Sequence, residues 1–151
     1  MDLVLDTGVL LAACLGRAAF APLAGNALHV VDLVPWEAES VMHESVWRLG
    51  RGLSVPQWPG LTMADFQGGF QSLKASVDPA SASRQLEVHP YSLGLADEAW
   101  FVAERCGFAK VYDAASVALA RLRGCRLVTL DARLMHSPAQ RLATLVGPAQ
   151  I

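Results

Sequence analysis

The sequence predicts an α/β protein in which a central parallel sheet is covered by helices on both faces, a three-layer α/β/α sandwich. Short apolar runs alternate along the chain with longer stretches that have helical spacing. These runs are apolar at successive residues rather than at every second one, which is typical of parallel strands buried on both faces. At 151 residues, a single domain spanning 1–151 is the expected organisation.

The predicted elements follow one another as strands and helices. Strands are indicated by β-branched or leucine-rich runs, and helices by apolar residues three and four positions apart. Glycine or proline closes several segments, namely at Gly16, Pro35, Gly107 and Gly124. The strands are expected at residues 3–5, 29–34, 86–88, 126–130 and 143–146. The helices are expected at 9–16, after a turn at Thr7-Gly8, and at 36–49, 62–73, 96–106 and 111–123, with one further short helix before the last strand.

Composition excludes several classes of protein. The formal net charge is -2, from 12 basic and 14 acidic residues, so net charge alone does not indicate a nucleic-acid partner. The three cysteines form no CxxC pair, which argues against a disulfide framework and against a cysteine zinc site. No apolar run reaches the length of a membrane span, and no basic segment precedes an apolar one at the N-terminus. A cytoplasmic protein without a membrane association is expected.

Two acidic residues follow predicted strands directly. Asp6 ends the run Leu3-Val4-Leu5, and Asp131 ends the run from Leu127 to Leu130. The carboxyl ends of parallel strands form the ligand crevice of an open sheet, so both carboxylates are candidate ligand-binding groups. The alternative is that each aspartate caps the helix that follows it.

Two further acids lie on predicted helices. Glu44 has apolar neighbours three residues away on either side, and its alternative role is a pair with Arg48 one turn later. Asp113 opens an alanine-rich helix, where the helix dipole alone favours a negative charge. Each acid has a structural explanation, but four carboxylates in such settings can together hold one or two hard divalent cations.

With these motifs the chain resembles PIN-domain proteins, and more narrowly the VapC-type toxin ribonucleases of bacterial toxin-antitoxin modules. The motifs span nearly the whole chain in the family's order: Leu5-Asp6-Thr7, Glu44, Tyr112-Asp113-Ala114 and Val128-Thr129-Leu130-Asp131. The resemblance implies that the catalytic metal ligands are Asp6, Glu44, Asp113 and Asp131, supported by the hydroxyl residues Thr7 and Thr129. One departure is Gly8, where the family usually has Ser or Asn.

The resemblance also implies an activity and partners. Mg²⁺, or Mn²⁺ in its place, would activate a water that hydrolyses an RNA phosphodiester bond. A cognate antitoxin protein and a homodimer are the expected partners, and Arg48 and Arg51 are candidate RNA contacts. Setting aside the four proposed ligands leaves 14 - 4 = 10 acids against 12 bases, a balance of +2 that suits RNA. The alternative function is a PIN-fold binding or scaffold module with impaired catalysis.

Particular residues of the sequence argue against other kinds of functional site. A receiver-like domain needs adjacent acids after the first strand, and a haloacid-dehalogenase-type phosphatase needs an aspartate in place of Gly8. The four histidines have neither HxxxH nor HExxH spacing, which disfavours a zinc hydrolase. Among the tryptophans, Trp47 and Trp100 are predicted to lie in the core. Trp58, in its Pro/Gly-rich loop, is predicted to be exposed or lightly covered and is a candidate interface anchor.

Overall fold

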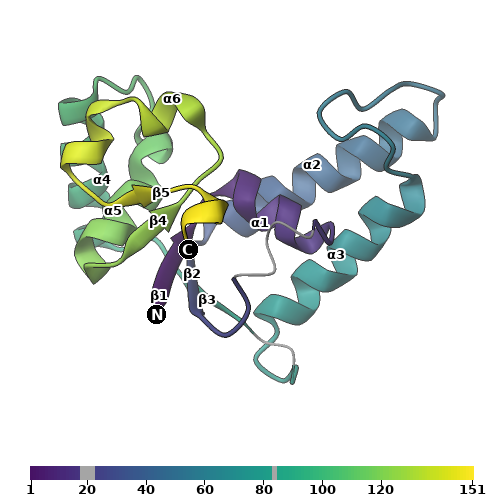
Figure 1. The fold of residues 1–151 in the computed structure, drawn as a ribbon, viewed down its shortest axis with the longest axis horizontal. Coiled ribbons are helices and arrows are strands. Elements are labelled where there is room, and N and C mark those ends of the chain that lie inside the picture. Colours follow the sequence, from purple (N-terminus) through teal and green to yellow (C-terminus); the bar gives the residue numbers. More distant parts are fainter. Residues whose placement is uncertain (18–22, 83–84) are drawn as a thin grey trace.

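Figure 1 shows the fold in a computed structural model, which describes residues 1–17, 23–82 and 85–151. Within these residues five parallel strands form one sheet in the order β3-β2-β1-β4-β5. The strands are β1 Asp2–Leu5, β2 Ala27–Val31, β3 Leu86–His89, β4 Arg126–Val128 and β5 Leu145–Val146. The helices are α1 Thr7–Cys14, α2 Leu33–Leu49, α3 Met63–Val77, α4 Leu93–Cys106, α5 Ala115–Arg123 and α6 Ala132–Met135. Short 3-10 turns are η2 Val111–Ala114, η3 Pro138–Arg141 and η4 Pro148–Gln150.

The helices lie on both faces of the sheet, so the predicted α/β/α architecture with a parallel sheet is confirmed. Helices α1, α2 and α3 pack together; α2 contacts β2, and α3 contacts β3. On the other face α5 lies against β1 and β2, and α4 packs on α5. The far ends of α2 and α3 project together from the body as an arm (Figure 1).

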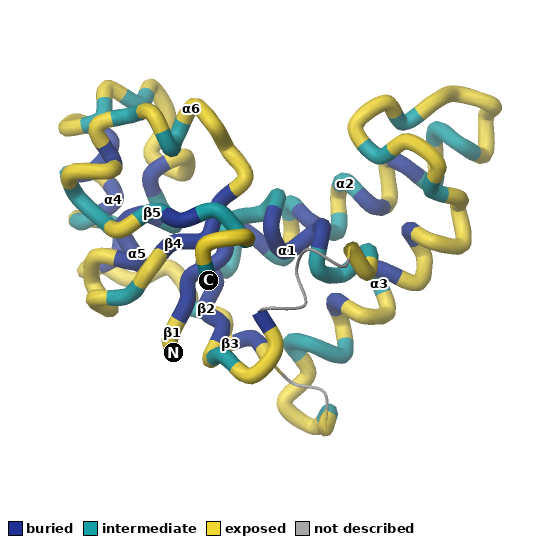
Figure 2. The backbone as a smooth tube through the Cα atoms, viewed as in Figure 1, coloured by how far each residue is buried: buried dark blue, intermediate teal, exposed yellow. Residues whose placement is uncertain are grey.

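Burial follows the predicted pattern of a parallel sheet. Leu3, Val4 and Leu5 of β1 are all fully buried, because helices cover both faces of this central strand. In Figure 2 the buried segments run along the strands and inner helix faces, whereas the loop joining α2 to α3 is mostly exposed. No helix in the described ranges combines the length and the hydrophobicity needed to cross a bilayer.

The boundary between β2 and α2 differs from the prediction. The sequence predicts a strand that runs to Val34 and is closed by Pro35, but β2 ends at Val31 and α2 already begins at Leu33. Pro35 therefore lies in the first turn of α2, where proline is tolerated because the N–H it lacks would have no helical acceptor. This shift brings the first turns of α2 to the carboxyl end of β2.

Other boundaries move for local reasons. The predicted helix 111–123 is the turn η2 followed by α5, so Asp113 lies in a 3-10 turn rather than in the α-helix. Helix α4 begins at Leu93, earlier than expected, because the hydroxyl of Ser92 accepts a hydrogen bond from the Leu95 N–H (3.2 Å) and caps it. The expected strand 126–130 is shorter, ending at Val128.

Two of the tryptophans, Trp47 and Trp100, lie on the surface and not in the core as predicted. Trp47 is 47% exposed and Trp100 is 61% exposed, whereas Trp58 is partly buried against the core. The exposed rings have polar neighbours: the Arg51 guanidinium lies 4.0 Å from the Trp47 ring centre, and Trp100 Nε1 donates to Glu104 Oε1 (3.0 Å). Helical spacing locates a side chain on a face of the helix, but it does not say whether another element covers that face.

Candidate metal and active site

The strand order reverses between β1 and β4. The chain places β2 and β3 on one side of β1, then returns to place β4 and β5 on the other. Ligands of open parallel sheets bind at such a reversal, beyond the carboxyl ends of the strands. Leu5 and Val128 are register partners, so the segments carrying Asp6 and Asp131 leave the sheet side by side.

Asp6 is held through both of its carboxylate oxygens. Oδ1 accepts a hydrogen bond from the Val9 N–H (2.9 Å) and caps α1, while Oδ2 accepts from the Thr129 hydroxyl. Burial raises the pKa of Asp6 above its ordinary value; the bonds from Thr129 and Val9 oppose this shift, and the charge of Asp131 adds to it. A buried carboxylate of this kind is ionised at less cost when a cation lies beside it.

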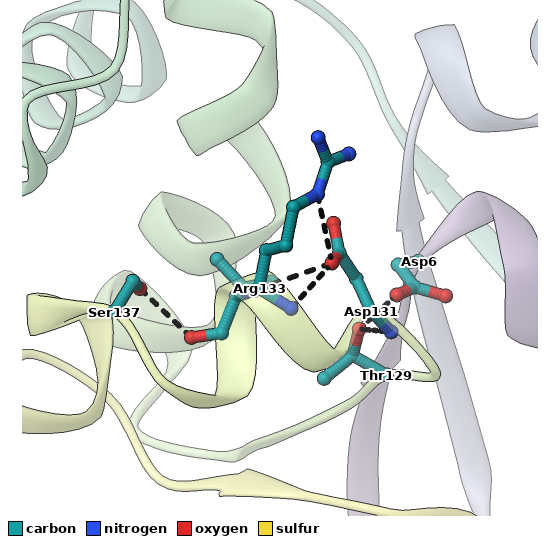
Figure 3. Close-up of polar contacts among 6 residues, drawn as sticks. Asp6, Thr129, Asp131, Arg133 and Ser137 are labelled. Atoms are coloured by element: carbon teal, nitrogen blue, oxygen red, sulfur yellow. Dashed lines mark hydrogen bonds and ion pairs between the residues drawn. The ribbon is translucent and has the colours of Figure 1, made fainter.

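Thr129 connects Asp6 to Asp131. Its side chain is buried, its hydroxyl donates to Asp6, and its Oγ1 accepts from the Asp131 N–H (3.0 Å), as Figure 3 shows. Asp131 Oδ1 in turn accepts from the N–H groups of Arg133 (2.8 Å) and Leu134 (3.3 Å), which caps α6. The capping role is therefore confirmed for both Asp6 and Asp131, and the same two carboxylates also line the cavity described next.

A cavity of about 390 Å³ opens at this end of the sheet. Four acidic side chains line it, each from a different segment: Asp6 after β1, Glu37 from α2, Asp113 from η2 and Asp131 after β4. Hydroxyl groups and apolar side chains complete the wall, among them Thr7, Ser116, Val34, Leu130 and Leu134. The structure thus brings three of the four predicted acids together.

The structure does not bring Glu44, the fourth predicted acid, into this cavity. It is exposed and borders a separate cavity with Arg48 and Val55. Glu37, which the sequence reasoning missed, lies in the acidic cavity instead, and its carboxylate accepts a hydrogen bond from the Thr7 hydroxyl. The two glutamates are seven residues apart, so they share one helix face but are separated by about 10 Å along the axis. The missed signal was the distance from the end of β2, since Glu37 lies in the second turn of α2.

The predicted RNA contacts lie on the arm, away from the acids. Arg48 Nε donates to the Ser54 carbonyl (2.9 Å), and Arg51 stacks on Trp47. One cationic side chain beside the acids is Arg133, whose Nε lies 3.7 Å from Asp131 Oδ1 and whose side chain is 95% exposed. Arg133 also borders a smaller cavity, of about 310 Å³, that shares Asp113 and Asp131 with the acidic one.

Gly8 lines the acidic cavity. A Cβ at this position would lie 3.6 Å from Asp6 Oδ1 and 3.9 Å from the Cβ of Leu130, which are ordinary van der Waals distances. The fold therefore leaves room for a side chain at position 8, and sterics do not require glycine there.

The chemistry of the four acids fits a hard divalent cation, because carboxylate oxygens are its preferred ligands. Their carboxylate oxygens are more widely separated than the ligand atoms of one bound ion would be. Among the residues that the structure describes, three candidate ligand side chains that lie within 4.8 Å of one another are found elsewhere, on β2 and β3. Asp113 is exposed, so rotation of its side chain can bring its oxygens closer to the other acids without disturbing the core.

Comparison with known proteins agrees with this architecture. Solved structures of similar fold include VapBC2 from Rickettsia felis bound to a promoter DNA fragment, with a TM-score of 0.61 and 13% identity over 97% of this chain and 98% of that chain. A toxin-antitoxin complex from Klebsiella pneumoniae gives a TM-score of 0.60 and 15% identity over 97% of each chain. A protein from Pyrobaculum aerophilum gives 0.61 and 20% identity, over 97% of this chain and 84% of that chain.

Sequence comparison gives the family. No curated protein matches the chain. The family model described as the PIN domain matches residues 3–139, a range that contains β1 without its first residue, all of β2 to β4, and all four acids of the cavity. With this match over most of its length, the chain belongs to the PIN domain family.

Proposed function

We propose that this chain is a metal-dependent endoribonuclease and the toxin of a toxin-antitoxin pair, acting in the cytoplasm as a single domain. One observation carries the proposal: four carboxylates from four separate segments line one cavity where the strand order reverses. Capping explains the positions of Asp6 and Asp131, but it does not explain why Glu37 and Asp113 face the same cavity. Negative charges brought together in this way repel one another unless a cation binds between them.

The residues proposed to hold Mg²⁺ or Mn²⁺ are Asp6, Glu37, Asp113 and Asp131. When bound, such an ion lowers the pKa of a coordinated water and neutralises charge that develops on the phosphate. The protein's own contribution is orientation. Asp6 is fixed by its bonds to Thr129 and Val9, and Glu37 by its bond to Thr7. Asp131 is held by the N–H groups that it caps, whereas the exposed Asp113 can adapt to the substrate.

Arg133 is our candidate contact for the phosphate next to the scissile bond. It extends into solvent beside Asp113 and Asp131, and arginine binds phosphate oxygens through two parallel hydrogen bonds. Arg48 and Arg51 remain proposals for contacts more distant from the acids. The positive balance of the chain without its four proposed ligands, 12 bases against 14 - 4 = 10 acids, supports RNA as the substrate.

An antitoxin partner and a homodimer are proposed on two grounds. Two of the similar structures are the VapBC2 complex and a toxin-antitoxin complex. In addition, several large apolar side chains are exposed next to the end of β3 and the start of α2, namely Trp36 (68%), Tyr91 (74%) and Leu93 (80%). The Tyr91 N–H donates to Asp32 Oδ2 (3.0 Å), which ties these two segments together. Exposed aromatic residues of this kind are typical of protein interfaces.

RNA cleavage with Mg²⁺ or Mn²⁺ tests the activity. We expect Asp6→Asn and Asp113→Asn, shown to be folded by circular dichroism, to lose turnover, while Glu44→Gln keeps it. A single-stranded DNA of the same sequence is the control for recognition of the ribose hydroxyl. Parental rates in both aspartate variants would refute the assignment. Absence of Mn²⁺ binding at millimolar concentration in calorimetry would favour a scaffold role instead.

The partner proposals have a separate test. Sedimentation velocity at micromolar concentration is expected to show a dimer, and a larger complex after mixing with the product of the neighbouring gene. Trp36→Ser is expected to weaken one of these associations without changing metal binding. A monomer that does not respond to the second protein would refute both associations and leave the nuclease proposal intact.

A further inference from the structure

A second group of candidate metal ligands lies on the sheet, outside the acidic cavity. His29 of β2 and Glu87 of β3 are register partners, and His89 lies two residues further along β3 on the same face. Ligand atoms of these three side chains lie within 4.8 Å of one another. None of the three side chains lines the acidic cavity.

The distances within this histidine-glutamate cluster match the needs of zinc. His29 Nδ1 lies 3.0 Å from His89 Nε2 and 3.4 Å from Glu87 Oε2. The other oxygen, Glu87 Oε1, lies 3.7 Å from His89 Nε2. A tetrahedral Zn²⁺ with bonds of about 2.0–2.1 Å separates its ligand atoms by about 3.3 Å. The two imidazole nitrogens and the Glu87 carboxylate, which turns one oxygen toward each imidazole, therefore surround a position for one ion. The fourth coordination position is left for water.

The second nitrogen of His29 gives independent support. His29 is 2% exposed, and its Nε2 is buried without a hydrogen-bond partner among the described residues. The nearest carboxylate oxygen, Asp2 Oδ2, lies 3.6 Å away on the side of the ring opposite to Glu87 and His89. Histidine ligands of metals usually donate their second N–H to a carboxylate, which fixes the ring for coordination. Asp2 is placed for that role, with Arg123 3.5 Å from the same Oδ2 atom.

We propose that His29, Glu87 and His89 bind one Zn²⁺, with Asp2 orienting the His29 ring from behind. Two imidazoles and one carboxylate suit Zn²⁺, whereas Mg²⁺ prefers oxygen ligands throughout, so the two sites of the molecule differ in metal class. The ion would join the edge strand β3 to β2. This inference does not depend on the proposed nuclease activity.

The spacing rules used on the sequence could not find this cluster. His29 and His89 are 60 residues apart, and the strand register alone brings them together. The local sequence signal of the site is Glu87 and His89. One residue separates them, so they lie on one face of a strand. Such a pair is common in solvent-exposed strands, and it indicates a site only when a third ligand faces it.

Zinc titration of chelator-treated, tag-free protein tests the proposal, with a chromophoric chelator as competitor and Co²⁺ as the spectroscopic probe. We expect one equivalent of Zn²⁺, a visible Co²⁺ spectrum of tetrahedral type, and a melting temperature raised by roughly 5–10 °C at 100 times Kd. Because Glu87 is exposed and His89 only partly buried, Glu87→Gln and His89→Gln should fold normally. Each should weaken zinc binding by about 100-fold or more, and Asp2→Asn by about tenfold.

Two controls separate this site from other zinc ligands in the chain. His136→Gln changes an exposed histidine elsewhere, and the double variant Asp6→Asn/Asp131→Asn removes two acids of the cavity. Both should keep the zinc equivalent. Zinc K-edge absorption of the unaltered protein should show two imidazole ligands and no sulfur. Sulfur ligation, loss of the equivalent in the double variant, or unchanged binding in both Glu87→Gln and His89→Gln would overturn the proposal.

Discussion

Helix α2 carries one glutamate toward the sheet, Glu37, and one toward the arm, Glu44, and the surroundings of the two side chains differ. At the end beside the sheet, Glu37 is partly buried, bonded to Thr7, and lines a cavity with three aspartates. Toward the far end, on the arm, Glu44 is exposed and borders a cavity lined by Arg48, other residues of α2 and the α2–α3 loop. Both glutamates lie on one helix face. They differ in their distance from the carboxyl ends of the strands, where the clustered acids line the open cavity.

Replacing each glutamate by glutamine gives the largest expected contrast. Glu37→Gln removes one carboxylate from the proposed metal site, so we expect RNA turnover with Mg²⁺ to fall by about 10²-fold or more. Glu44→Gln should change turnover by less than about twofold, since exposed positions away from a site are nearly neutral. A loss in Glu44→Gln alone, measured at saturating metal on folded protein, would place the functional acid on the arm, and equal losses would refute the contrast between the two positions.

Thr129→Val tests the support behind the aspartates. The substitution keeps the shape of the side chain but removes the donor to Asp6 and the acceptor of the Asp131 N–H. We expect a loss of about 1–3 kcal/mol in the free energy of unfolding and about 10–100-fold weaker Mn²⁺ binding. The lost donor should also raise the pKa of Asp6 further, so metal binding should require a higher pH.

A threonine on the arm is the matched control for Thr129. Thr62 caps α3, its Oγ1 accepting from the Asp65 N–H (3.2 Å). Thr62→Val should cost about 1 kcal/mol in denaturant unfolding but leave Mn²⁺ binding unchanged. A similar loss of Mn²⁺ affinity in both threonine variants would show that general stability, not the contact with Asp6, sets the affinity.

Asp6→Asn should stabilise the metal-free protein at neutral pH. Burial raises the pKa of Asp6 in the folded chain, so between the unfolded value of 3.8 and the folded value the native state binds more protons. Stability therefore falls as pH rises through that window, and the loss is complete above the folded pKa. Asparagine keeps an oxygen acceptor for Val9 without the charge. Calorimetry in chelator should show a higher melting temperature for the variant at pH 7 and no difference below about pH 3.8.

Two arginines extend the contrast to substrate binding. Arg133 lies beside Asp113 and Asp131, whereas Arg51 lies on the arm against Trp47. We expect Arg133→Ala to weaken binding of a short RNA about fivefold in low salt, an effect that salt reduces, and Arg51→Ala to have no effect on the same RNA. Fluorescence anisotropy with catalytically inactive Asp113→Asn protein measures both. Weaker binding only in Arg51→Ala would favour an RNA path along the arm.

The sheet and three of the acids could be predicted because they depend on local pattern. Apolar strands and the acid after each of them appear directly in the sequence around Asp6 and Asp131, and Asp113 precedes a helix of small residues. The fourth acid depended on where α2 begins. A proline after an apolar run predicts the end of a strand, whereas Pro35 is accommodated in the first helical turn.

What the sequence could not show was which faces are covered and which strands are neighbours. Trp47 and Trp100 have helical spacing but no element over them, and the pairing of His29 with Glu87 exists only in the register of β2 and β3. Both features depend on the tertiary structure. A spacing rule applied along one segment does not contain them.

Gly8→Ser has the smallest expected effect, and it changes one residue in the wall of the acidic cavity. Position 8 has room for a side chain, because a Cβ there would point toward Asp6 Oδ1 and Leu130 at ordinary contact distances. A serine hydroxyl there can donate to Asp6. This hydrogen bond would oppose part of the increase in pKa that burial causes in this carboxyl. We therefore expect metal binding to extend to slightly lower pH and turnover to rise by about twofold at most. Gly68→Ser on α3, where a Cβ meets nothing within 4 Å, is the matched control and should change neither quantity. If Gly8→Ser instead lowered metal affinity, the glycine would be required by the way the ligand approaches Asp6, and not merely tolerated.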